Sequence, residues 1–130
     1  MICHFIVYVR DQEASTKFYR QVLALEPTLN VPGMTEFKLG EGCILGLMPE
    51  KGIKRLLGDT IQDPEKSNGI SRAEIYLQVP EPRDFMQRAR SAGAKVLSRV
   101  EPRGWGHEAG YVLDPDGHVV AFARPLPNGK

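Results

Sequence analysis

The sequence predicts an α+β fold made of two successive modules, each with the element order βαβββ. Two strand-like segments read as copies of each other: His-Phe-Ile-Val-Tyr-Val at residues 4–9 and Glu-Ile-Tyr-Leu-Gln-Val at residues 74–79. Each copy is followed by a helical pattern and then by strands joined through glycine turns. We therefore expect one domain over residues 1–130, with module one at about 2–49 and module two at about 72–125.

Alternation along the two repeated strands separates a core face from a second face of unusual composition. Successive side chains of a strand point to opposite sides of the sheet. The core faces carry apolar residues only: Phe5, Val7, Val9, Ile75, Leu77 and Val79. The opposite faces mix polar, charged and aromatic residues: His4, Ile6, Tyr8, Glu74, Tyr76 and Gln78. This mixture suits a ligand cavity better than a face that only meets solvent.

Local signals predict the other elements of module one. Asp11 is a helix N-cap, and apolar residues then recur at helical intervals at Ala14, Phe18, Val22 and Leu25. The Val-Pro-Gly turn at residues 31–33 follows the helix. Residues 35–39 and 43–48 then read as a hairpin around Gly-Glu-Gly at residues 40–42.

Module two repeats this order. After the strand at 74–79, a helix is expected from about Pro82 to Ala92, with Gly93 as its C-terminal stop. Three strands should follow, at residues 95–100, 109–113 and 118–123. The last two are joined by Asp-Pro-Asp-Gly at residues 114–117, a strong turn signal.

Between the modules lies a charged connection, residues 50–71, that is rich in Gly, Asp and Asn. Its Ile53, Leu56 and Leu57 are spaced to form one helical turn. Connections of this length inside compact domains are usually functional lids or flexible linkers, and the sequence leaves both interpretations open.

Composition excludes several classes of partner. The chain has 17 basic and 16 acidic residues, so it lacks the positive field that a nucleic acid partner requires. No apolar run approaches the roughly 20 residues that cross a bilayer, and no secretory signal begins the sequence. Cys3 and Cys43 are too few for a disulfide framework and alternate onto expected core faces. A cytoplasmic protein with no membrane or nucleic acid partner is the resulting expectation.

These features together resemble the vicinal oxygen chelate superfamily, the group of glyoxalases, bleomycin-resistance proteins and extradiol dioxygenases. The resemblance rests on the paired modules, His4 in the first strand, Phe18-Tyr19 in the first helix and the turn at 114–117. It covers residues 2 to about 125. It implies that the strands curl into a half-open, eight-stranded barrel around a cavity, commonly completed by pairing of two chains. A homodimer is therefore expected.

The resemblance also implies four equivalent positions at which metal-using relatives place their ligands. In this sequence those positions hold His4, Gly46, Glu74 and Ala121. A catalytic divalent site usually has about three protein ligands and one open position. With His4 and Glu74 as its metal ligands the site is incomplete, so no tightly bound cofactor is expected. Weak binding of nickel, zinc or manganese is the most that this pair would support.

His4 and Glu74 are also the candidates for chemistry without a metal. Their matching positions suggest an ion pair across the cavity floor, and such a pair could act as acid and base on a carbonyl substrate. A third metal ligand, if one exists, would come from His107 or Glu36.

Other residues are expected to line the cavity and bind the ligand. Trp105 is the only tryptophan and lies between two glycines in a loop, where relatives that bind drugs carry a Trp-Gly pair. Strand alternation and loop position give the full set: Tyr8, Ile44, Met48, Tyr76, Gln78, Arg103, Trp105, His107 and Val119. Walls of this composition suit a small organic molecule with an aromatic or carbonyl part.

Three functions fit these residues. The first is a homodimeric protein of the glyoxalase and bleomycin-resistance type that binds a small organic ligand. The second is a lyase of the lactoylglutathione type that uses a weak or atypical divalent metal site. The third is an oligomerisation or regulatory module without catalysis. Asp114 and Asp116 are assigned to their turn and His118 to the surface, without a chemical role.

Overall fold

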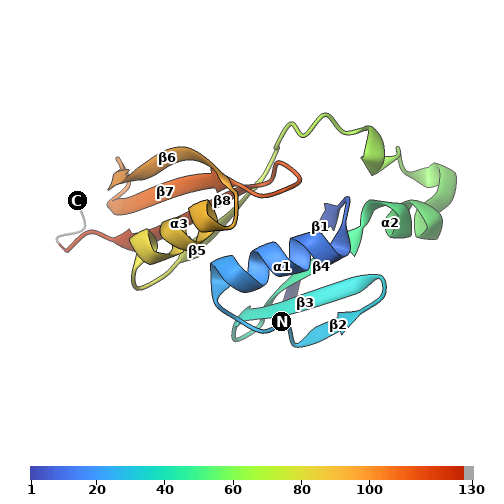
Figure 1. The fold of residues 1–130 in the computed structure, drawn as a ribbon, viewed down its shortest axis with the longest axis horizontal. Helices are drawn as coiled ribbons and strands as arrows, with labels where there is room; N and C mark the ends of the chain where they lie inside the picture. Colours follow the sequence, from blue (N-terminus) through green and yellow to red (C-terminus); the bar gives the residue numbers. More distant parts are fainter. Residues whose placement is uncertain (128–130) are drawn as a thin grey trace. The chain divides into compact units, whose positions relative to one another are not determined.

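The computed structural model describes residues 1–127 and contains two compact units, each built on one four-stranded sheet (Figure 1). One unit comprises residues 1–20 and 24–68, and the other comprises residues 21–23 and the chain from residue 69 onward. The predicted fold class, α+β with two βαβββ modules, is confirmed. The closure of the two sheets into one barrel and the grouping of both modules in one domain stay predictions.

The first unit contains a mixed sheet in the order β1-β4-β3-β2, with β1 parallel to β4 and the other pairs antiparallel. Its elements are β1 (Cys3–Val9), α1 (Gln12–Leu23), β2 (Leu29–Val31), β3 (Met34–Gly40) and β4 (Cys43–Pro49). Figure 1 shows α1 lying along this sheet. Each strand with predicted bounds lies within one or two residues of them, and the short β2 is the strand of the βαβββ order for which no bounds were predicted.

Helix α1 begins at the predicted cap and ends earlier than its apolar pattern suggests. The Asp11 carboxylate accepts a hydrogen bond of 3.0 Å from the Ala14 amide, which satisfies an amide of the first turn. At the other end Ala24 adopts a left-handed conformation with φ 54°, which terminates the helix. Leu25, expected on the helix, therefore lies beyond it and is 40% exposed.

The core of the first unit lies on the predicted face of the sheet, but it does not extend to the start of β1. Five strand residues on this face are buried: Val7, Val9, Phe37, Leu45 and Leu47. Thr16 of α1 and Thr35 of β3 share a buried hydrogen bond of 2.8 Å between their hydroxyl groups. Phe5, expected in the core, is 41% exposed.

The connection after β4 contains more regular structure than the sequence predicts. The single helical turn expected around Ile53 is an eight-residue helix, α2 (Glu50–Leu57), followed by two short 3₁₀ turns, η1 (Gly58–Thr60) and η2 (Pro64–Lys66). The Lys54 ammonium donates hydrogen bonds to the carbonyl oxygens of Gly58 at 2.7 Å and Ile61 at 3.0 Å. These bonds satisfy carbonyls beyond the helix C-terminus, where a cation is favourable.

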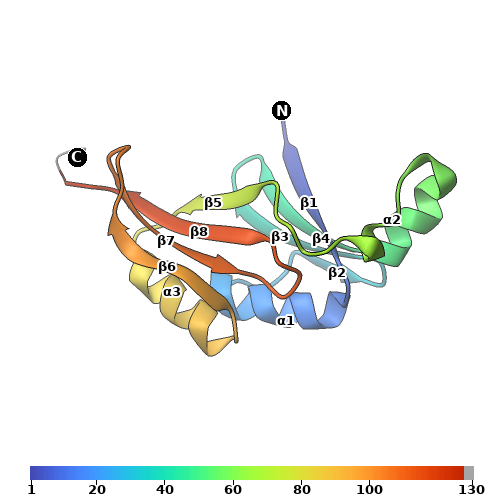
Figure 2. The ribbon, with the colours of Figure 1, turned by 90° about the horizontal axis from the view of Figure 1, so that it is seen from above.

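The second unit repeats the topology, with the sheet order β5-β8-β7-β6 and β5 parallel to β8. Its elements are β5 (Glu74–Gln78), α3 (Pro82–Ser91), β6 (Lys95–Pro102), β7 (His107–Leu113) and β8 (Val119–Pro125). Figure 2 shows α3 lying along β6 and β7. In the turn between β7 and β8, one Asp114 carboxylate oxygen accepts hydrogen bonds of 2.9 Å from the amides of Asp116 and His118, as the turn assignment predicted.

None of the helices in residues 1–127 is long and apolar enough to cross a membrane. The longest, α1, has 12 residues. A bilayer-spanning helix needs about 20.

A buried carboxylate connects α3 to β7 and β8, the two interior strands of the second sheet. Glu108 of β7 is 7% exposed and binds Arg124 of β8 at 2.6 Å and Arg83 of α3 at 3.0 Å. The hydrogen bond from Arg124, followed by the contribution of Arg83, lowers the pKa of Glu108 below its usual value of 4.5. The folded state therefore keeps this carboxylate ionised at pH values where the unfolded chain binds a proton.

Glu108→Gln is expected to lower the midpoint of urea unfolding at neutral pH, because it removes the ionised partner of two arginines. A lowered folded-state pKa stabilises the fold above about pH 4.5, and this contribution is lost as the pH falls through the lowered value. The difference between the variant and the unmodified protein should therefore shrink below pH 4.5. Glu41→Gln is the control, because the Glu41 side chain is 97% exposed beside Lys38. A difference that grows on acidification would contradict this account.

Candidate ligand-binding site

Three of the predicted ligand-binding residues form a hydrogen-bonded cluster in the second unit. Tyr76 is in β5, His107 begins β7, and Trp105 is in the loop between β6 and β7. The Trp105 indole N–H donates to the Tyr76 hydroxyl oxygen at 2.9 Å, and the same hydroxyl lies 2.7 Å from His107 Nδ1. The Tyr76 and His107 rings stack with their centroids 5.8 Å apart. We refer to Tyr76, Trp105 and His107 as the aromatic cluster.

The types of donor and acceptor in the aromatic cluster indicate the direction of its hydrogen bonds. An indole N–H can only donate, so the Tyr76 oxygen accepts from Trp105. In the His107 tautomer whose Nδ1 is unprotonated, the Tyr76 hydroxyl donates its hydrogen to Nδ1. The imidazole then carries its proton on Nε2, and this N–H is a donor that the other two residues of the cluster do not use.

Arg103 supports the loop that carries Trp105 and His107. Its guanidinium donates to the Ala109 carbonyl from both Nε and Nη2, at 3.1 and 2.8 Å, and Nη2 also binds Ser98 Oγ at 2.7 Å. The guanidinium also lies 5.2 Å from the centre of the Tyr111 ring. The Arg103 guanidinium thus binds groups of the protein itself and holds the loop in place. The pairing of Arg103 with an anionic ligand stays a prediction.

Tyr111 of β7 extends the polar and aromatic face toward Glu74. Burial and, secondarily, the negative charge of Glu74 raise the pKa of Tyr111, so its hydroxyl stays neutral at physiological pH. Glu74, the first residue of β5, is exposed and pairs in register with the half-buried Val119. Gln78 is exposed at the far end of the same strand.

The predicted site residues of the first unit share one face of their sheet. His4 Nδ1 lies 3.4 Å from Glu36 Oε2, so the histidine has a carboxylate neighbour within its own unit. Tyr8, Ile44 and Met48 are half-buried on the face of His4, with His4 opposite Ile44 and Tyr8 opposite Met48. The ion pair of His4 with Glu74 and a shared cavity remain predictions.

Gly46 stands at a position where the resemblance implies a metal ligand, and its surroundings are tight even for a Cβ atom. It is buried, and a Cβ atom there would lie 3.0 Å from Ile6 Cγ1 and 3.3 Å from Met34 Sδ. A side chain at this position would therefore require Ile6 and Met34 to move. The contact of 3.0 Å is tighter than ordinary packing, so even alanine would press on its neighbours.

Ala121 occupies the corresponding position of the second unit and is also buried. It is fully buried on β8, between Tyr76 of β5 and Tyr111 of β7 in the sheet register. Glycine and alanine carry no side-chain atom that can bind a metal ion. The residues at these two positions therefore do not fit the family's metal site.

A group of metal-type side chains occurs at a different place, in the turn before β8. Oxygen and nitrogen atoms of Asp114, Asp116 and His118 lie within 4.8 Å of one another. His118 Nδ1 is 2.7 Å from Asp114 Oδ2, and Asp114 is buried by the turn that it organises. His118, expected on the surface, is half-buried as a result. These contacts agree with a structural role of the group in the turn.

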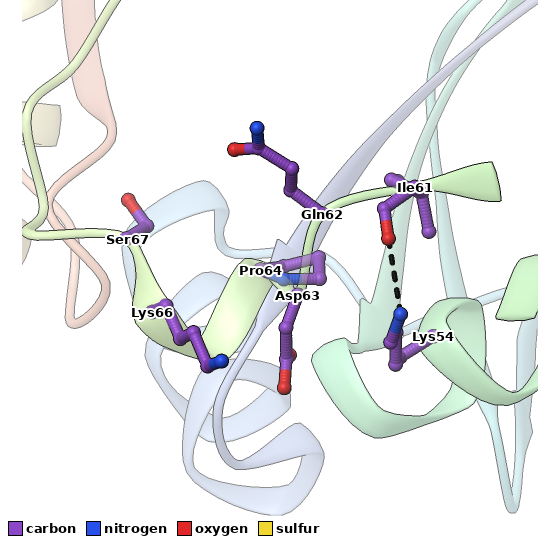
Figure 3. Close-up of a pocket in the computed structure, with 7 residues that line it drawn as sticks. All are labelled: Lys54, Ile61, Gln62, Asp63, Pro64, Lys66 and Ser67. Carbon is purple, nitrogen blue, oxygen red and sulfur yellow. Dashed lines mark hydrogen bonds between the residues drawn. The ribbon is translucent and has the colours of Figure 1, made fainter. Parts of the chain in front are cut away.

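A separate hollow of about 620 Å³ lies in the connection of the first unit and was not expected from the sequence (Figure 3). It is lined by Lys54, Ile61, Gln62, Asp63, Pro64, Lys66 and Ser67. Figure 3 shows the bond from Lys54 to the Ile61 carbonyl at its rim. The Asp63 carboxylate accepts a bond of 3.0 Å from the Glu65 amide. The hollow thus results from the way in which the connection between the modules folds, and local sequence patterns do not predict that conformation.

Solved structures with similar folds are numerous among glyoxalase-related proteins. A glyoxalase-related enzyme from Fulvimarina pelagi is 21% identical with a TM-score of 0.79, covering 95% of this chain and 87% of that one. A glyoxalase/bleomycin resistance protein/dioxygenase family enzyme from Burkholderia phytofirmans is 15% identical, with a TM-score of 0.79 and 95% and 97% coverage. TioX from Micromonospora is 16% identical, with a TM-score of 0.69 and 97% and 99% coverage. At these identities the likeness concerns the fold.

Sequence comparison adds curated relatives that match part of the chain, and a family match. An uncharacterized protein of Mycobacterium bovis is 30% identical over 80 residues, which cover 62% of this chain and 52% of that protein. Two Mycobacterium tuberculosis proteins are also 30% identical over 80 residues, which cover 46% of each, so the chain spans about half the length of these relatives. The family model of the Glyoxalase/Bleomycin resistance protein/Dioxygenase superfamily matches residues 1–122. The chain, with its two βαβββ modules, therefore belongs to this superfamily.

Proposed function

We propose that the protein binds a small organic ligand at the aromatic cluster, with an incomplete metal site. The observation that carries this proposal is the linkage of Trp105, Tyr76 and His107 through one hydroxyl group. Trp105 remains 56% exposed although its indole N–H is already bonded. An exposed, oriented aromatic ring beside a polar group is typical of a binding surface.

The chemistry of the aromatic cluster favours a planar ligand that carries a hydrogen-bond acceptor. Trp105 offers a ring face, and His107, in the tautomer whose Nδ1 accepts from Tyr76, offers its Nε2–H as a donor. Tyr111 stays neutral beside them, because burial and Glu74 raise its pKa. A carbonyl group attached to an aromatic or conjugated ring satisfies both requirements.

Tyr76→Phe should weaken binding of such a ligand about 3- to 10-fold, because one hydroxyl group orients both neighbours and a typical hydrogen bond contributes about 0.5–1.5 kcal/mol. Trp105 is the only tryptophan, so its fluorescence reports on the site directly. We would titrate benzaldehyde, benzamide and bleomycin into both proteins. His118→Gln is the control, since His118 is in the turn before β8. No saturable response to any of the three compounds would refute the proposal for this ligand class.

The incomplete metal site is tested by isothermal titration with nickel, zinc and manganese. The closed surroundings of Gly46 and Ala121 support the expectation that none binds with micromolar affinity or better. Micromolar binding that disappears in His4→Ala would overturn this part of the proposal.

A lyase of the lactoylglutathione type is the second candidate, and the contact between His4 and Glu36 favours it. The two side chains lie 3.4 Å apart, and Glu36 is a carboxylate outside the four family positions. Turnover of the adduct of glutathione and methylglyoxal, with added divalent ions, would support this activity if Glu74→Ala abolished it. Absence of turnover with nickel, zinc and manganese would remove it.

We further propose a homodimer in the cytoplasm, by similarity to the family. Sedimentation equilibrium at micromolar concentration should give twice the chain mass of 14.5 kDa. A dimer without binding of any tested compound would favour the third function, an oligomerisation or regulatory module.

A further inference from the structure

We propose that Cys3 and Cys43 are a redox-responsive pair that forms a reversible disulfide between β1 and β4. They are the only cysteines of the chain, and both are free and exposed. The prediction that both cysteines lie in the core is wrong, because the residues of this sheet face are buried only from Val7 on β1 and Leu45 on β4 onward. The structure thus leaves two thiols accessible at the same end of two paired strands.

The sheet register places the two cysteines directly side by side. Cys3 is the register partner of Cys43 in the parallel ladder, and the Cys3 amide donates to the Gly42 carbonyl at 2.7 Å. Neighbouring strands are about 4.8 Å apart, which lies inside the range of about 4.4–6.8 Å between the Cα atoms of bridged cysteines.

Both thiols also lie on the same side of the sheet. Cys3 is on the same face of β1 as Val7, and Cys43 is on the same face of β4 as Leu45, because each pair is separated by an even number of positions. Val7 and Leu45 are both buried on one face of the sheet. Partners in a parallel ladder point to the same side, so no strand rotation is needed to bring the sulfur atoms together. Each cysteine is the first residue of its strand, where small backbone adjustments are easiest.

The reaction needs an external oxidant, and a low-molecular-weight disulfide such as glutathione disulfide supplies it. One cysteine thiolate attacks a sulfur atom of the oxidant, forms a mixed disulfide and releases one glutathione thiol. The second cysteine then attacks the protein sulfur of that mixed disulfide and releases the second glutathione. Two protein thiols are oxidised to one disulfide, and one glutathione disulfide is reduced to two molecules of glutathione. The two protons lost by the protein thiols are taken up by the two glutathione thiolates.

The bridge would fix the edge of the first sheet next to a candidate site residue. β1 is an edge strand whose ladder partner is β4, and His4 follows Cys3 directly. A bond between the strand ends would hold the start of β1, and with it the backbone of His4, in the register that places the imidazole near Glu36. The redox state would thereby influence the order of this part of the protein.

The experiment compares oxidation of the folded and the unfolded chain. The reduced protein is equilibrated with mixtures of glutathione and glutathione disulfide, in buffer and in concentrated urea, then alkylated and analysed by intact mass and peptide mapping. In buffer we expect a product lighter by two hydrogen atoms, with the peptides of Cys3 and Cys43 joined. The equilibrium constant should exceed that in urea by about tenfold or more, because only the fold holds the thiols adjacent.

Cys3→Ser and Cys43→Ser are the matched controls. Each should stop at a single glutathione adduct, because no second thiol remains to displace it. The proposal is overturned if the unmodified folded protein accumulates two glutathione adducts, forms only disulfides between chains, or oxidises no more readily than in urea.

Discussion

Gly46→Glu is expected to lower the free energy of unfolding by about 2–4 kcal/mol, from overpacking of about 1–3 kcal/mol and from burial of a polar group. Gly46 is a buried residue of the interior strand β4, and its Cβ position is already 3.0 Å from Ile6 Cγ1. A carboxylate in this space would have to displace Ile6 and Met34. Urea unfolding followed by circular dichroism measures the change.

Gly40→Glu provides the matched control, since Gly40 is exposed and its Cβ position has open space around it. That variant should change stability by much less. We also expect Gly46→Glu to gain no micromolar affinity for nickel, zinc or manganese. A variant that keeps the original stability and binds one of these ions would show that Ile6 and Met34 yield easily, contrary to the packing described above.

Phe122→Ala is expected to lower the free energy of unfolding by about 3–5 kcal/mol, the usual cost of removing a buried aromatic side chain. Phe122 is fully buried on β8, and its ring lies 5.4 Å from that of Phe85 on α3. The cavity left behind would open between the helix and the strand that carries Ala121.

Phe5→Ala is the control of the same residue type, because Phe5 is 41% exposed. Its loss of stability should be clearly smaller when both variants are unfolded in urea. Equal losses would mean that Phe5 is covered in solution, for instance by a second chain.

Most of the fold could be predicted because its signals are local. The Asp11 cap, the Gly-Glu-Gly hairpin and the Asp-Pro-Asp-Gly turn act through their own neighbours, and the structure has each of them in place. The extent of α2 was underestimated, because its end depends on Lys54 binding carbonyls four and seven residues further on. The exposure of Cys3 was also not predicted. The alternation of side chains along a strand shows which face of the sheet a residue is on, but it does not show how far along the strand that face is buried.

The candidate site was predictable as a set of residues, whereas the bonds between them were not. Strand alternation and the Gly-Trp-Gly loop named Tyr76, Trp105 and His107 as lining residues. The hydrogen bonds join Tyr76 to His107, which is 31 residues further along the chain, and to Trp105, which is 29 residues further along. Only the order of the strands in the sheet brings these residues together. The bonds of Arg103 to the Ala109 carbonyl and to Ser98 were likewise not predictable from local patterns, and its pairing with an anionic ligand stays a prediction.

The position of Ala121 in the sheet has a consequence for how substitutions in this unit combine. Tyr76 is the register partner of Ala121 on one side and also supplies the hydroxyl that joins Trp105 to His107. A larger side chain at position 121 would have to enter a fully buried position between Tyr76 and Tyr111. A change at position 121 is therefore expected to alter the aromatic cluster as well, so that its effect depends on the residue at position 76.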